Sequence, residues 1–361
     1  MRIGIDARAA AEVPAGRGRY VRELLEAIGR SDTQHEFLLY ARSRWSSPEL
    51  GERFQWRLIA SRDPLWHIVT ARRASSECDV YLSTNSYLTV WFTRIPAVAV
   101  VFDMITFDRR LAPQRRAALI ERATLRLAVR RAAALLAASE STRNDLVSRY
   151  PMAVPKTRVV GLAADESFSP EGADEGILKR YRLHKQYVLV TGTLEPRKNL
   201  PRLVEAFAGL PAELLARYEL VVVGPSGWEM DETLSSIAAH AGSVRALGYV
   251  PDEHLPALYR GAELFCYPSL YEGFGLPVLE AMQSGTAVVT SGLSSLPEVG
   301  GDAVAYVDPL DVADIRRALA ELLLDPELRA RYAARAVARA KLYSWRATAN
   351  ETLAALESVA R

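Results

Sequence analysis

Cysteine is almost absent from this sequence, which restricts how the fold can be held together. Cys78 and Cys266 are the only two thiols among 361 residues. Neither a disulfide framework nor a four-cysteine zinc site can be built from two cysteines. Such a composition suits a reducing compartment, the cytoplasm. We therefore expect hydrophobic cores, not cross-links, to stabilise the fold.

Long apolar runs and an excess of either charge are missing as well. No run approaches the roughly 18 apolar residues that cross a bilayer, and the start of the chain lacks the apolar stretch of a signal peptide. The 45 basic and 43 acidic residues leave a formal net charge of +2. A general nucleic-acid binder carries a strongly basic domain, so nucleic acid is not an expected partner. Membrane contact is expected only as peripheral contact at the inner face.

Length and charge distribution indicate two different halves. At about 150 residues per domain, the length predicts two domains that each bury a core. Up to residue 170 there are 26 basic and 18 acidic residues, whereas the remainder holds 19 and 25. Only the first half therefore favours an anionic surface or ligand.

Short β-rich runs alternate with helical stretches along the chain, a pattern typical of parallel sheets crossed over by helices. The first half is expected to contain strands at 2–6, 36–40, 55–59, 79–83, 97–102, 134–138 and 158–160. The second half is expected to contain strands at 187–191, 219–223, 244–247, 264–267, 287–290 and 303–307. The pattern predicts two doubly wound, Rossmann-like α/β domains.

Composition also sets the expected domain boundaries. Residues 163–175 are rich in Pro, Gly, Asp and Glu without periodicity, so they are the expected linker. We place the N-terminal domain at 1–165 and the C-terminal domain at 176–342. Helix formers dominate beyond Asp311, and residues 343–361 are expected to form a C-terminal helix that packs back on the N-terminal domain.

A glycine-bearing loop follows the first expected strand, at the carboxyl end where open α/β sheets bind ligands. Gly16 and Gly18 lie just ahead of a helix, where glycines let a phosphate approach backbone N–H groups. The third glycine of a dinucleotide fingerprint would fall on Val21, which excludes that motif. An ordinary turn before a helix explains these glycines equally well.

A second loop, residues 192–200, follows the first strand of the second domain and leads into an amphipathic helix. Its adjacent cations can clamp a diphosphate, because Arg197 offers a planar fork and Lys198 a point charge. The alternative is a solvated cation pair at a helix N-terminus, an arrangement that the helix dipole disfavours.

The third loop is the most specific and spans residues 267–281, where a strand ends and a helix begins near Pro277. Glu272 lies in the loop and Glu280 lies in the helix. Two carboxylates so placed suit hydrogen bonds from sugar and ribose hydroxyls. Either one can instead be an ordinary surface glutamate.

Together these motifs resemble those of family 4 glycosyltransferases, which have the GT-B fold and two glutamates separated by seven residues, as Glu272 and Glu280 are. The resemblance extends in order over nearly the whole chain, to segments 16–18, 138–142, 192–200, 247–250 and 296–298. It implies two Rossmann-like domains that face a central crevice. The C-terminal domain would bind a nucleotide sugar, and the N-terminal domain would bind the acceptor.

The resemblance implies a role for each motif. Arg197 and Lys198 would hold the donor diphosphate, and backbone dipoles would help them to stabilise the charge that grows on it. Glu280 would bind the ribose, and Glu272 would approach the donor sugar. The other donor-binding residues that it implies are Gly16, Gly18, Gly192, Thr193, Tyr249, Val250, Gly273, Phe274, Gly275 and Leu276.

The implied reaction retains the configuration of the sugar and requires neither a metal nor another cofactor. No Asp-x-Asp cluster is present in the sequence. Many relatives have a histidine before an aspartate at the end of an N-terminal-domain strand, where this chain has Phe102 and Asp103. A phenylalanine side chain cannot exchange protons, which argues against a histidine-mediated step. Asp103 is expected to contact the sugar or the acceptor and joins Glu272, Arg197 and Lys198 as a candidate catalytic residue.

A basic helix is expected at residues 113–131. Its arginines recur at helical spacing, at Arg115, Arg122, Arg126 and Arg130. Ile120, Ala123 and Leu127 add an apolar stripe. A basic amphipathic helix can rest on anionic lipid, which would suit a polyprenyl-linked acceptor. The alternative is the solvated face of a crossover helix.

The expected activity is retaining transfer of a sugar to a glycan or lipid-linked acceptor, in bacterial cell-surface polysaccharide or glycolipid synthesis. Mannose from GDP-mannose is the leading donor, because the sequence resembles bacterial mannosyltransferases. Three alternatives stay open: a UDP-sugar-dependent family 4 enzyme, a GT-B-like epimerase or phosphorylase, and a binding protein that keeps the donor site without catalysis.

Overall fold

The computed structural model describes residues 1–13, 16–84, 87–108, 110–111, 115–172, 174–228 and 230–360. The chain divides into two compact units. The first unit comprises Met1–Ala163 and Ser344–Arg361, and the second comprises Ala164–Tyr343. Among the helices of the described residues, none combines the length and the apolarity that crossing a bilayer requires.

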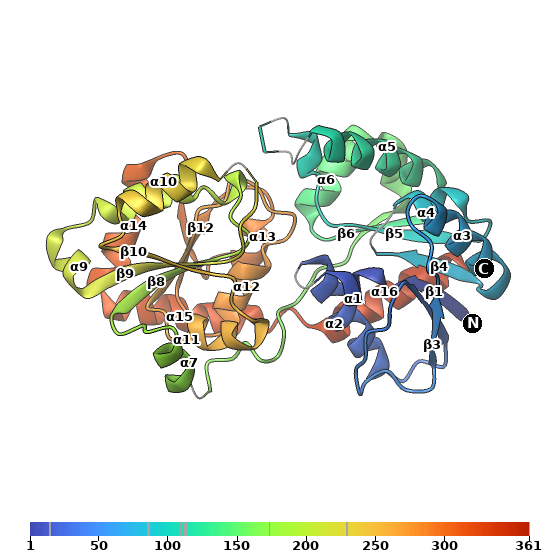
Figure 1. The fold of residues 1–361 in the computed structure, drawn as a ribbon, viewed down its shortest axis with the longest axis horizontal. Helices are drawn as coiled ribbons and strands as arrows, with labels where there is room; N and C mark the ends of the chain where they lie inside the picture. The colour runs from blue at the N-terminus through green and yellow to red at the C-terminus, as the bar shows by residue number, and fades with distance from the viewer. Residues whose placement is uncertain are drawn as a thin grey trace. The chain divides into compact units, whose positions relative to one another are not determined.

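A parallel sheet in the order β3-β2-β1-β4-β5-β6-β7 forms the centre of the first unit (Figure 1). Its strands are β1 (Arg2–Asp6), β2 (Glu36–Ala41), β3 (Phe54–Leu58), β4 (Val80–Ser83), β5 (Ala97–Val101), β6 (Ala134–Ala137) and β7 (Thr157–Val159). Ile3 of β1 lies opposite Phe37 of β2 on one side and Val80 of β4 on the other. The strand order therefore changes direction between β1 and β4.

Helices cover both faces of this sheet. They are α1 (Arg8–Glu12), α2 (Arg17–Gly29), α3 (Leu65–Glu77), α4 (Tyr87–Phe92), α5 (Arg115–Arg131), α6 (Glu140–Arg149) and α16 (Trp345–Val359), with the 3-10 turns η1 (Ile105–Phe107) and η2 (Pro151–Lys156). Although α16 follows the second unit in sequence, it packs on α2 and on β4, β5 and β6 (Figure 1). Trp345 and Leu356 of α16 are buried there, so the C-terminal helix is part of the first unit's core.

The second unit repeats the design with a parallel sheet in the order β10-β9-β8-β11-β12-β13. Its strands are β8 (Gln186–Thr191), β9 (Tyr218–Val223), β10 (Val244–Gly248), β11 (Leu264–Tyr267), β12 (Val288–Ser291) and β13 (Ala305–Val307). Val188 of β8 pairs with Leu220 of β9 and with Leu264 of β11. Here the order changes direction between β8 and β11.

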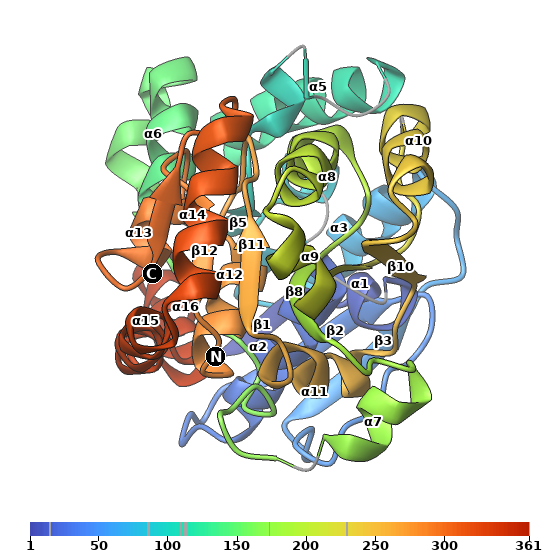
Figure 2. The ribbon, with the colours of Figure 1, turned by 90° about the vertical axis from the view of Figure 1, so that its left-hand side faces the viewer.

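Two helical layers enclose the second sheet. Its helices are α7 (Glu175–Arg180), α8 (Leu200–Ala208), α9 (Ala212–Arg217), α10 (Asp231–Ala239), α11 (Leu255–Arg260), α12 (Leu276–Gln283), α13 (Leu296–Gly300), α14 (Val312–Leu324) and α15 (Pro326–Ala340), with η3 (Pro196–Lys198) and η4 (Asp252–His254). One layer contains α8, α10 and α14, and the other contains α11, α12 and α15 (Figure 1; Figure 2). The expected α/β class with two doubly wound, Rossmann-like sheets is confirmed.

Candidate functional site

Two of the loops singled out in the sequence meet in the second unit. The loop 192–199 follows β8, and the loop 268–275 follows β11. Because β8 and β11 are neighbouring parallel strands on either side of the reversal in strand order, both loops leave the same edge of the sheet. Ligands of doubly wound sheets bind at this position, since the two loops diverge there and leave room.

The backbone of both loops depends on residues that tolerate positive φ. Gly192 has φ +119°, and a Cβ there would come within 3.3 Å of the Lys198 side chain. Asn199 adopts the left-handed conformation between η3 and α8. Gly275, with φ +105°, directly precedes α12. These turns bring η3 and the start of α12 to the same end of the sheet, and they require glycine or asparagine.

A compact ion cluster links the two loops. The Arg197 guanidinium contacts Glu195 Oε1 at 2.5 Å and Glu272 Oε2 at 2.5 Å. Lys198 Nζ donates to Glu272 Oε1 at 2.7 Å. The side chains of Lys198 and Glu272 are 5% and 8% exposed. Two cations and two carboxylates therefore balance each other in a nearly dry environment, so neither the cation pair nor Glu272 is a solvated surface feature.

Neutral hydroxyl groups fix the position of Glu272 within this cluster. Tyr267 donates to Glu272 Oε1 at 2.9 Å, and Ser269 donates to the same oxygen at 2.8 Å. Lys198 also contacts the Tyr267 hydroxyl. The Glu272 backbone N–H donates to Ser294 Oγ at 2.9 Å. The carboxylate is thus oriented by groups from β11, its following loop and the segment after β12.

Burial and neighbouring charges act against each other on the pKa values in the cluster. Burial would raise the pKa of Glu272, but Arg197 and Lys198 hold it down at about 2. Burial lowers the pKa of Lys198, and Arg197 lowers it further. The pKa of Glu195 is raised, chiefly because of burial. Glu272 is consequently an anion over the whole physiological range and cannot serve there as a general acid.

Glu280, the second glutamate of the motif, is held separately from the ion cluster. It lies in α12 and is 4% exposed. The Tyr259 hydroxyl donates to Glu280 Oε2 at 2.9 Å and lies 2.6 Å from the Thr191 hydroxyl. Since Thr191 is the last residue of β8, this chain of hydrogen bonds ties Glu280 to the start of the loop that carries the cations.

The remaining donor-binding candidates of the second unit differ in exposure. Phe274 is buried and packs edge-on against Tyr343, with ring centroids 5.7 Å apart. Gly273, Leu276 and Thr193 are partly exposed along the two loops. Just beyond β10, at the edge of the sheet, Tyr249 is 58% exposed and Val250 is buried. Strands are about 5 Å apart, so this edge lies roughly 10 Å from β8.

Gly16 and Gly18 belong to the first unit and have distinct structural roles. Gly16 precedes α2 with φ +56°, and a Cβ there would meet open space. Gly18 is buried in the first turn of α2, where a Cβ would lie 1.7 Å from the Val13 carbonyl oxygen. Close backbone packing therefore explains why residue Gly18 has no side chain, without invoking a ligand. At Gly16, the reason for a glycine is the positive φ of the backbone.

Asp103 and Phe102 also lie in the first unit, directly after β5. Asp103 accepts a hydrogen bond from the Ile105 backbone N–H at 3.1 Å and is partly exposed. The Phe102 ring packs edge-on against Tyr20 at 4.9 Å, and the Arg17 guanidinium lies 5.7 Å from its centre. The phenylalanine thus joins an aromatic cluster with Tyr20 and Trp345.

Sequence reasoning missed the residues that hold the motif glutamates. Glu195 precedes the two cations and forms an ion pair with Arg197. Tyr267 and Ser269 fix Glu272, and Tyr259 holds Glu280. Tyr267 and Ser269 could have been found from their places at the end of β11, because polar residues at that edge face the ligand-binding position. Tyr259 gives no such signal, since it lies on a helix, near the C-terminal end of α11.

The arrangement suits recognition of a charged, hydroxylated ligand. Two cations beside the N-terminal turn of α12 can hold phosphate oxygens, and the buried carboxylates can accept hydrogen bonds from hydroxyls. Within the described ranges, no group of three or more His, Cys, Asp or Glu side chains is placed to share a metal ion.

Comparison with known proteins gives a family match inside the second unit and relatives that align over a larger part of the chain. Residues 179–339 match the family model for glycosyl transferases group 1. The chain is 40% identical over 224 residues to the O-antigen chain mannosyltransferase B of Escherichia coli, and 32% identical over 229 residues to an MMP alpha-(1->4)-mannosyltransferase of Mycolicibacterium hassiacum. These alignments cover 61% and 62% of this chain, and 59% and 53% of those proteins. This chain therefore matches less than two thirds of either relative.

Among solved structures, Anabaena HepE in complex with UDP and glucose superimposes with a TM-score of 0.79 at 18% identity. The superposition covers 99% of this chain and 100% of HepE. At that identity the likeness concerns the fold, and it confirms the GT-B class expected from the sequence. Over residues 179–339, which contain Arg197, Lys198, Glu272 and Glu280, the chain is similar to group 1 glycosyl transferases.

Proposed function

We propose that this chain is a retaining glycosyltransferase of family 4, which moves a sugar from a nucleotide donor to a glycan or lipid-linked acceptor. The process would be bacterial cell-surface polysaccharide or glycolipid synthesis. One observation supports the proposal above all. Arg197, Lys198 and Glu272 meet in a buried cluster at the reversal of strand order, inside the segment that matches glycosyl transferases group 1.

In the proposed reaction, the bond between the sugar and the diphosphate breaks while negative charge grows on the leaving nucleoside diphosphate. Arg197 and Lys198 stabilise that charge, helped by the backbone N–H groups of residues 273–276 at the start of α12. Glu280 accepts a hydrogen bond from the ribose, and Glu272 accepts one from the donor sugar. No protein nucleophile is needed when the leaving phosphate itself assists the acceptor hydroxyl, and we propose a reaction without a metal or another cofactor.

The proposed donor is GDP-mannose. The Escherichia coli and Mycolicibacterium hassiacum relatives are mannosyltransferases by name, which favours mannose. The second candidate donor is a UDP-sugar, because HepE has the same fold and was solved with UDP and glucose. Tyr249 and Val250, beyond β10, are the residues that we assign to the base and that would discriminate between the donors.

We assign acceptor binding to the first unit, with Asp103 as the residue that contacts the sugar or acceptor. Gly16 and Gly18 remain proposed phosphate contacts, although packing alone explains Gly18. An epimerase or phosphorylase and a silent binding protein are weaker candidates; Phe102, in place of a histidine, favours the silent protein over the epimerase. For a lipid-linked acceptor we propose peripheral membrane contact at the inner face.

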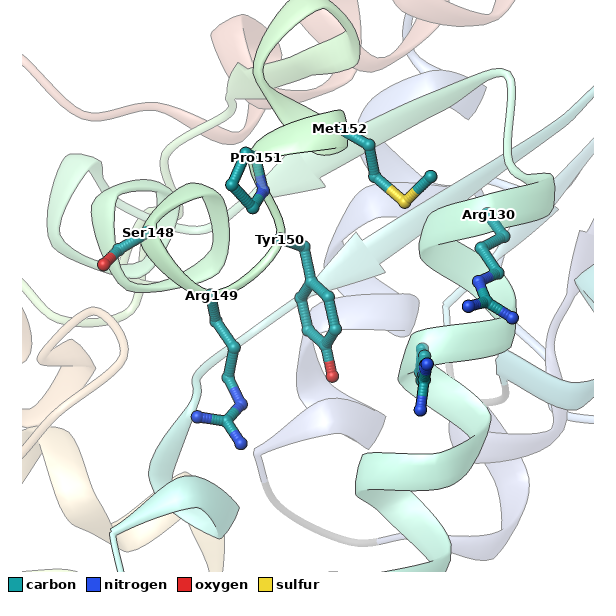
Figure 3. Close-up of a pocket in the computed structure, with 7 residues that line it drawn as sticks. Arg130, Ser148, Arg149, Tyr150, Pro151 and Met152 are labelled. Atoms are coloured by element: carbon teal, nitrogen blue, oxygen red, sulfur yellow. The ribbon is translucent and has the colours of Figure 1, made fainter.

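The arginines of α5 do not contribute equally to the proposed membrane contact. Arg122 Nε donates to the Thr106 carbonyl at 2.6 Å, and its guanidinium lies 5.5 Å from the Phe107 ring centre. Arg126 and Arg130 are exposed. Arg122 therefore supports the turn η1, and we assign the proposed membrane contact to Arg126 and Arg130, which line a pocket between α5 and η2 (Figure 3). For Arg115 this contact stays the expectation drawn from the sequence.

A donor panel tests the activity. The purified chain is incubated with GDP-mannose, UDP-glucose and related nucleotide sugars, with and without glycan acceptors, and release of nucleoside diphosphate is measured. We expect release from GDP-mannose and a loss of at least about a hundredfold in kcat/KM for Lys198→Ala, because a buried charged contact to the leaving group is removed. Lys185→Ala is the matched control, since Lys185 is exposed in the same unit.

The outcomes separate the candidates. Release of nucleoside diphosphate from UDP-sugars alone would favour the second candidate donor, a UDP-sugar, over GDP-mannose. Donor binding in a calorimetric titration without turnover on any acceptor would favour a silent binding protein. Wild-type turnover in Lys198→Ala would overturn the site assignment.

A further inference from the structure

Hydroxyl side chains at the end of β12, and in the turn that follows it, hold the loop after β11. All three donors are buried. In order, Thr290, Ser291 and Ser295 donate to the backbone carbonyl oxygens of Tyr267, Ser269 and Glu272, at 2.8, 2.5 and 2.8 Å. Because β11 and β12 are paired strands, these bonds extend the attachment of the two segments beyond the sheet. The backbone of residues 267–272 is therefore fixed as far as the glutamate of the ion cluster.

Ser294 adds a bond in the opposite direction. The Glu272 backbone N–H donates to Ser294 Oγ at 2.9 Å, while the Glu272 carbonyl oxygen accepts from Ser295. Two adjacent serines thus pair both backbone polar groups of one residue. Glu272 is buried, and a buried N–H group that loses its partner destabilises the fold. The backbone on both sides of the Glu272 side chain is consequently held by residues 294–295.

Ser294 pays for this contact with an unfavourable backbone conformation. Its φ is +51°, in the left-handed region where the Cβ of an L residue lies too close to the backbone. Glycine adopts this region freely, and the same unit has glycine at the positive-φ positions 192 and 275. A serine at position 294 supplies a hydroxyl that glycine lacks, and this hydroxyl accepts from the Glu272 N–H. Strain of this kind persists where the surrounding structure holds it, and it clusters at functional sites.

The attachment gains importance when a substrate engages the cations. Arg197 and Lys198 pair with Glu272 in the structure, and we assign both of them to the donor diphosphate. When they turn to the diphosphate, the Glu272 carboxylate keeps the hydroxyls of Tyr267 and Ser269. Its direction then depends on these uncharged partners and on the bonds that hold its backbone. Small displacements of a group that orients a substrate cost large factors in rate.

We propose that Ser294 is a positioning residue of the transfer reaction. Its hydroxyl holds the Glu272 backbone and thereby orients the carboxylate toward a hydroxyl of the donor sugar, which is the benefit that offsets its strained conformation. The inference rests on the proposed function, because there Glu272 accepts a hydrogen bond from the donor sugar. Ser294 itself is assigned no contact with the substrate.

Steady-state kinetics, with the donor that the panel identifies, compare Ser294→Ala, which removes the hydroxyl, with Ser294→Gly, which removes the hydroxyl and the strain. We expect kcat to fall about tenfold or more in both variants, with the donor KM within about twofold of wild type, because the cations and Glu280 are untouched. Calorimetry should show a higher melting temperature for Ser294→Gly than for Ser294→Ala. Activity would then follow the hydroxyl and not the stability.

Arg182 provides the matched control, because it has φ +53° and is exposed on the turn after α7. Arg182→Gly should likewise melt above Arg182→Ala, and both should keep the wild-type kcat. A wild-type kcat in Ser294→Gly would overturn the proposal, because the hydroxyl would then not be needed. A kcat that rises and falls with the melting temperature of the Ser294 variants would mean a purely structural role. A raised KM at unchanged kcat would assign Ser294 to donor binding instead.

A measurement without substrate separates this inference from the proposed function. Glu272→Gln is introduced into the wild-type chain and into Ser294→Ala, and the urea midpoints are measured at pH 7. We expect a smaller shift in the Ser294→Ala background, because a displaced carboxylate contributes less to the ion cluster. Equal shifts would refute positioning by Ser294, whether or not the chain turns over a donor. Unequal shifts without turnover of any donor would count against the proposed function alone.

Discussion

At the scale of single residues, the second unit holds two cations and two carboxylates in contact at the position where the proposed substrate would bind. Arg197 and Lys198 are neutralised by Glu195 and Glu272, and all four side chains are largely buried. A diphosphate that uses the two cations must therefore compete with Glu272 for them. Glu272 then becomes free to accept a hydrogen bond from a hydroxyl, so binding of the anion and orientation of the sugar are coupled.

The depressed pKa of Glu272 predicts how the stability of the second unit depends on pH. The pKa is about 2 in the folded chain, against about 4.3 for an unperturbed glutamate, which corresponds to roughly 3 kcal/mol. This stabilisation is fully present above the unfolded pKa and is lost as the pH falls toward 2. Glu272→Gln should therefore lower the free energy of unfolding at pH 7, and the difference from wild type should shrink by pH 3.

Urea denaturation at the two pH values, followed by circular dichroism, measures this difference. Glu205→Gln serves as the control because Glu205 is exposed in the middle of α8. A gap between wild type and Glu272→Gln that stays constant from pH 7 to pH 3 would contradict the role of the charge.

The motif residues could be predicted from the sequence, but their supports could not. Spacing and strand ends placed Arg197, Lys198 and Glu272 at one sheet edge, because topology alone brings these loops together. The sequence could not predict that Glu272 pairs directly with both cations, because this pairing depends on how the side chains pack in three dimensions. Tyr259 illustrates the limit: its hydroxyl reaches Glu280 across two helices, and no local pattern marks it.

At the scale of the elements, the expected strands are present, with ends shifted by one or two residues. Buried strands of a parallel sheet contain continuous apolar, valine-rich runs such as Val98 to Val101, and these runs can be recognised without a structure. Helix faces were harder to predict. On α5 the sequence pattern could not tell whether Ile120 faces the core or the solvent, because that choice depends on how the helix is rotated against α4 and η1.

The N-terminal turn of α2 gives a prediction at this scale. Gly18→Ala places a Cβ 1.7 Å from the Val13 carbonyl, so the turn must shift at a cost of about 1–3 kcal/mol or more. Gly16→Ala meets no atom of the described residues, but its φ of +56° with ψ of −111° is a conformation that L residues rarely adopt, at a cost of about 1–3 kcal/mol. We expect the larger drop in melting temperature for Gly18→Ala, measured by calorimetry. Equal drops would show that steric packing of the turn is not what Gly18 provides.

At the scale of the whole molecule, the chain of the first unit is interrupted by the second. Residues 164–343 form one unit, and Ser344–Arg361 return to the other. The tryptophans are distributed unevenly, because Trp228 alone belongs to the second unit, whereas Trp45, Trp56, Trp66, Trp91 and Trp345 belong to the first. Intrinsic fluorescence therefore reports mainly on the first unit.

Truncation after Tyr343 should destabilise the first unit selectively. It removes the buried side chains of Trp345, Leu353 and Leu356 and exposes the face of α2 that they cover. Tyr343, which packs on Phe274 in the second unit, is kept. We expect the fluorescence midpoint in urea to fall sharply while a second transition persists in circular dichroism.

Glu351→Gln is the control for the truncation, since Glu351 is exposed on the same helix. An unchanged fluorescence midpoint in the truncated chain would mean that α16 is not needed for the first unit to fold.

The return of α16 to the first unit has a consequence for synthesis. A ribosome makes the chain from the N-terminus, and domains generally fold in that order as they emerge. Here the N-terminal unit lacks its last helix until the entire second unit has been translated. The C-terminal unit is therefore the first that can be completed, and the apolar surface on α2 stays uncovered until α16 has been translated. Chaperone binding to nascent chains should accordingly persist until α16 has emerged.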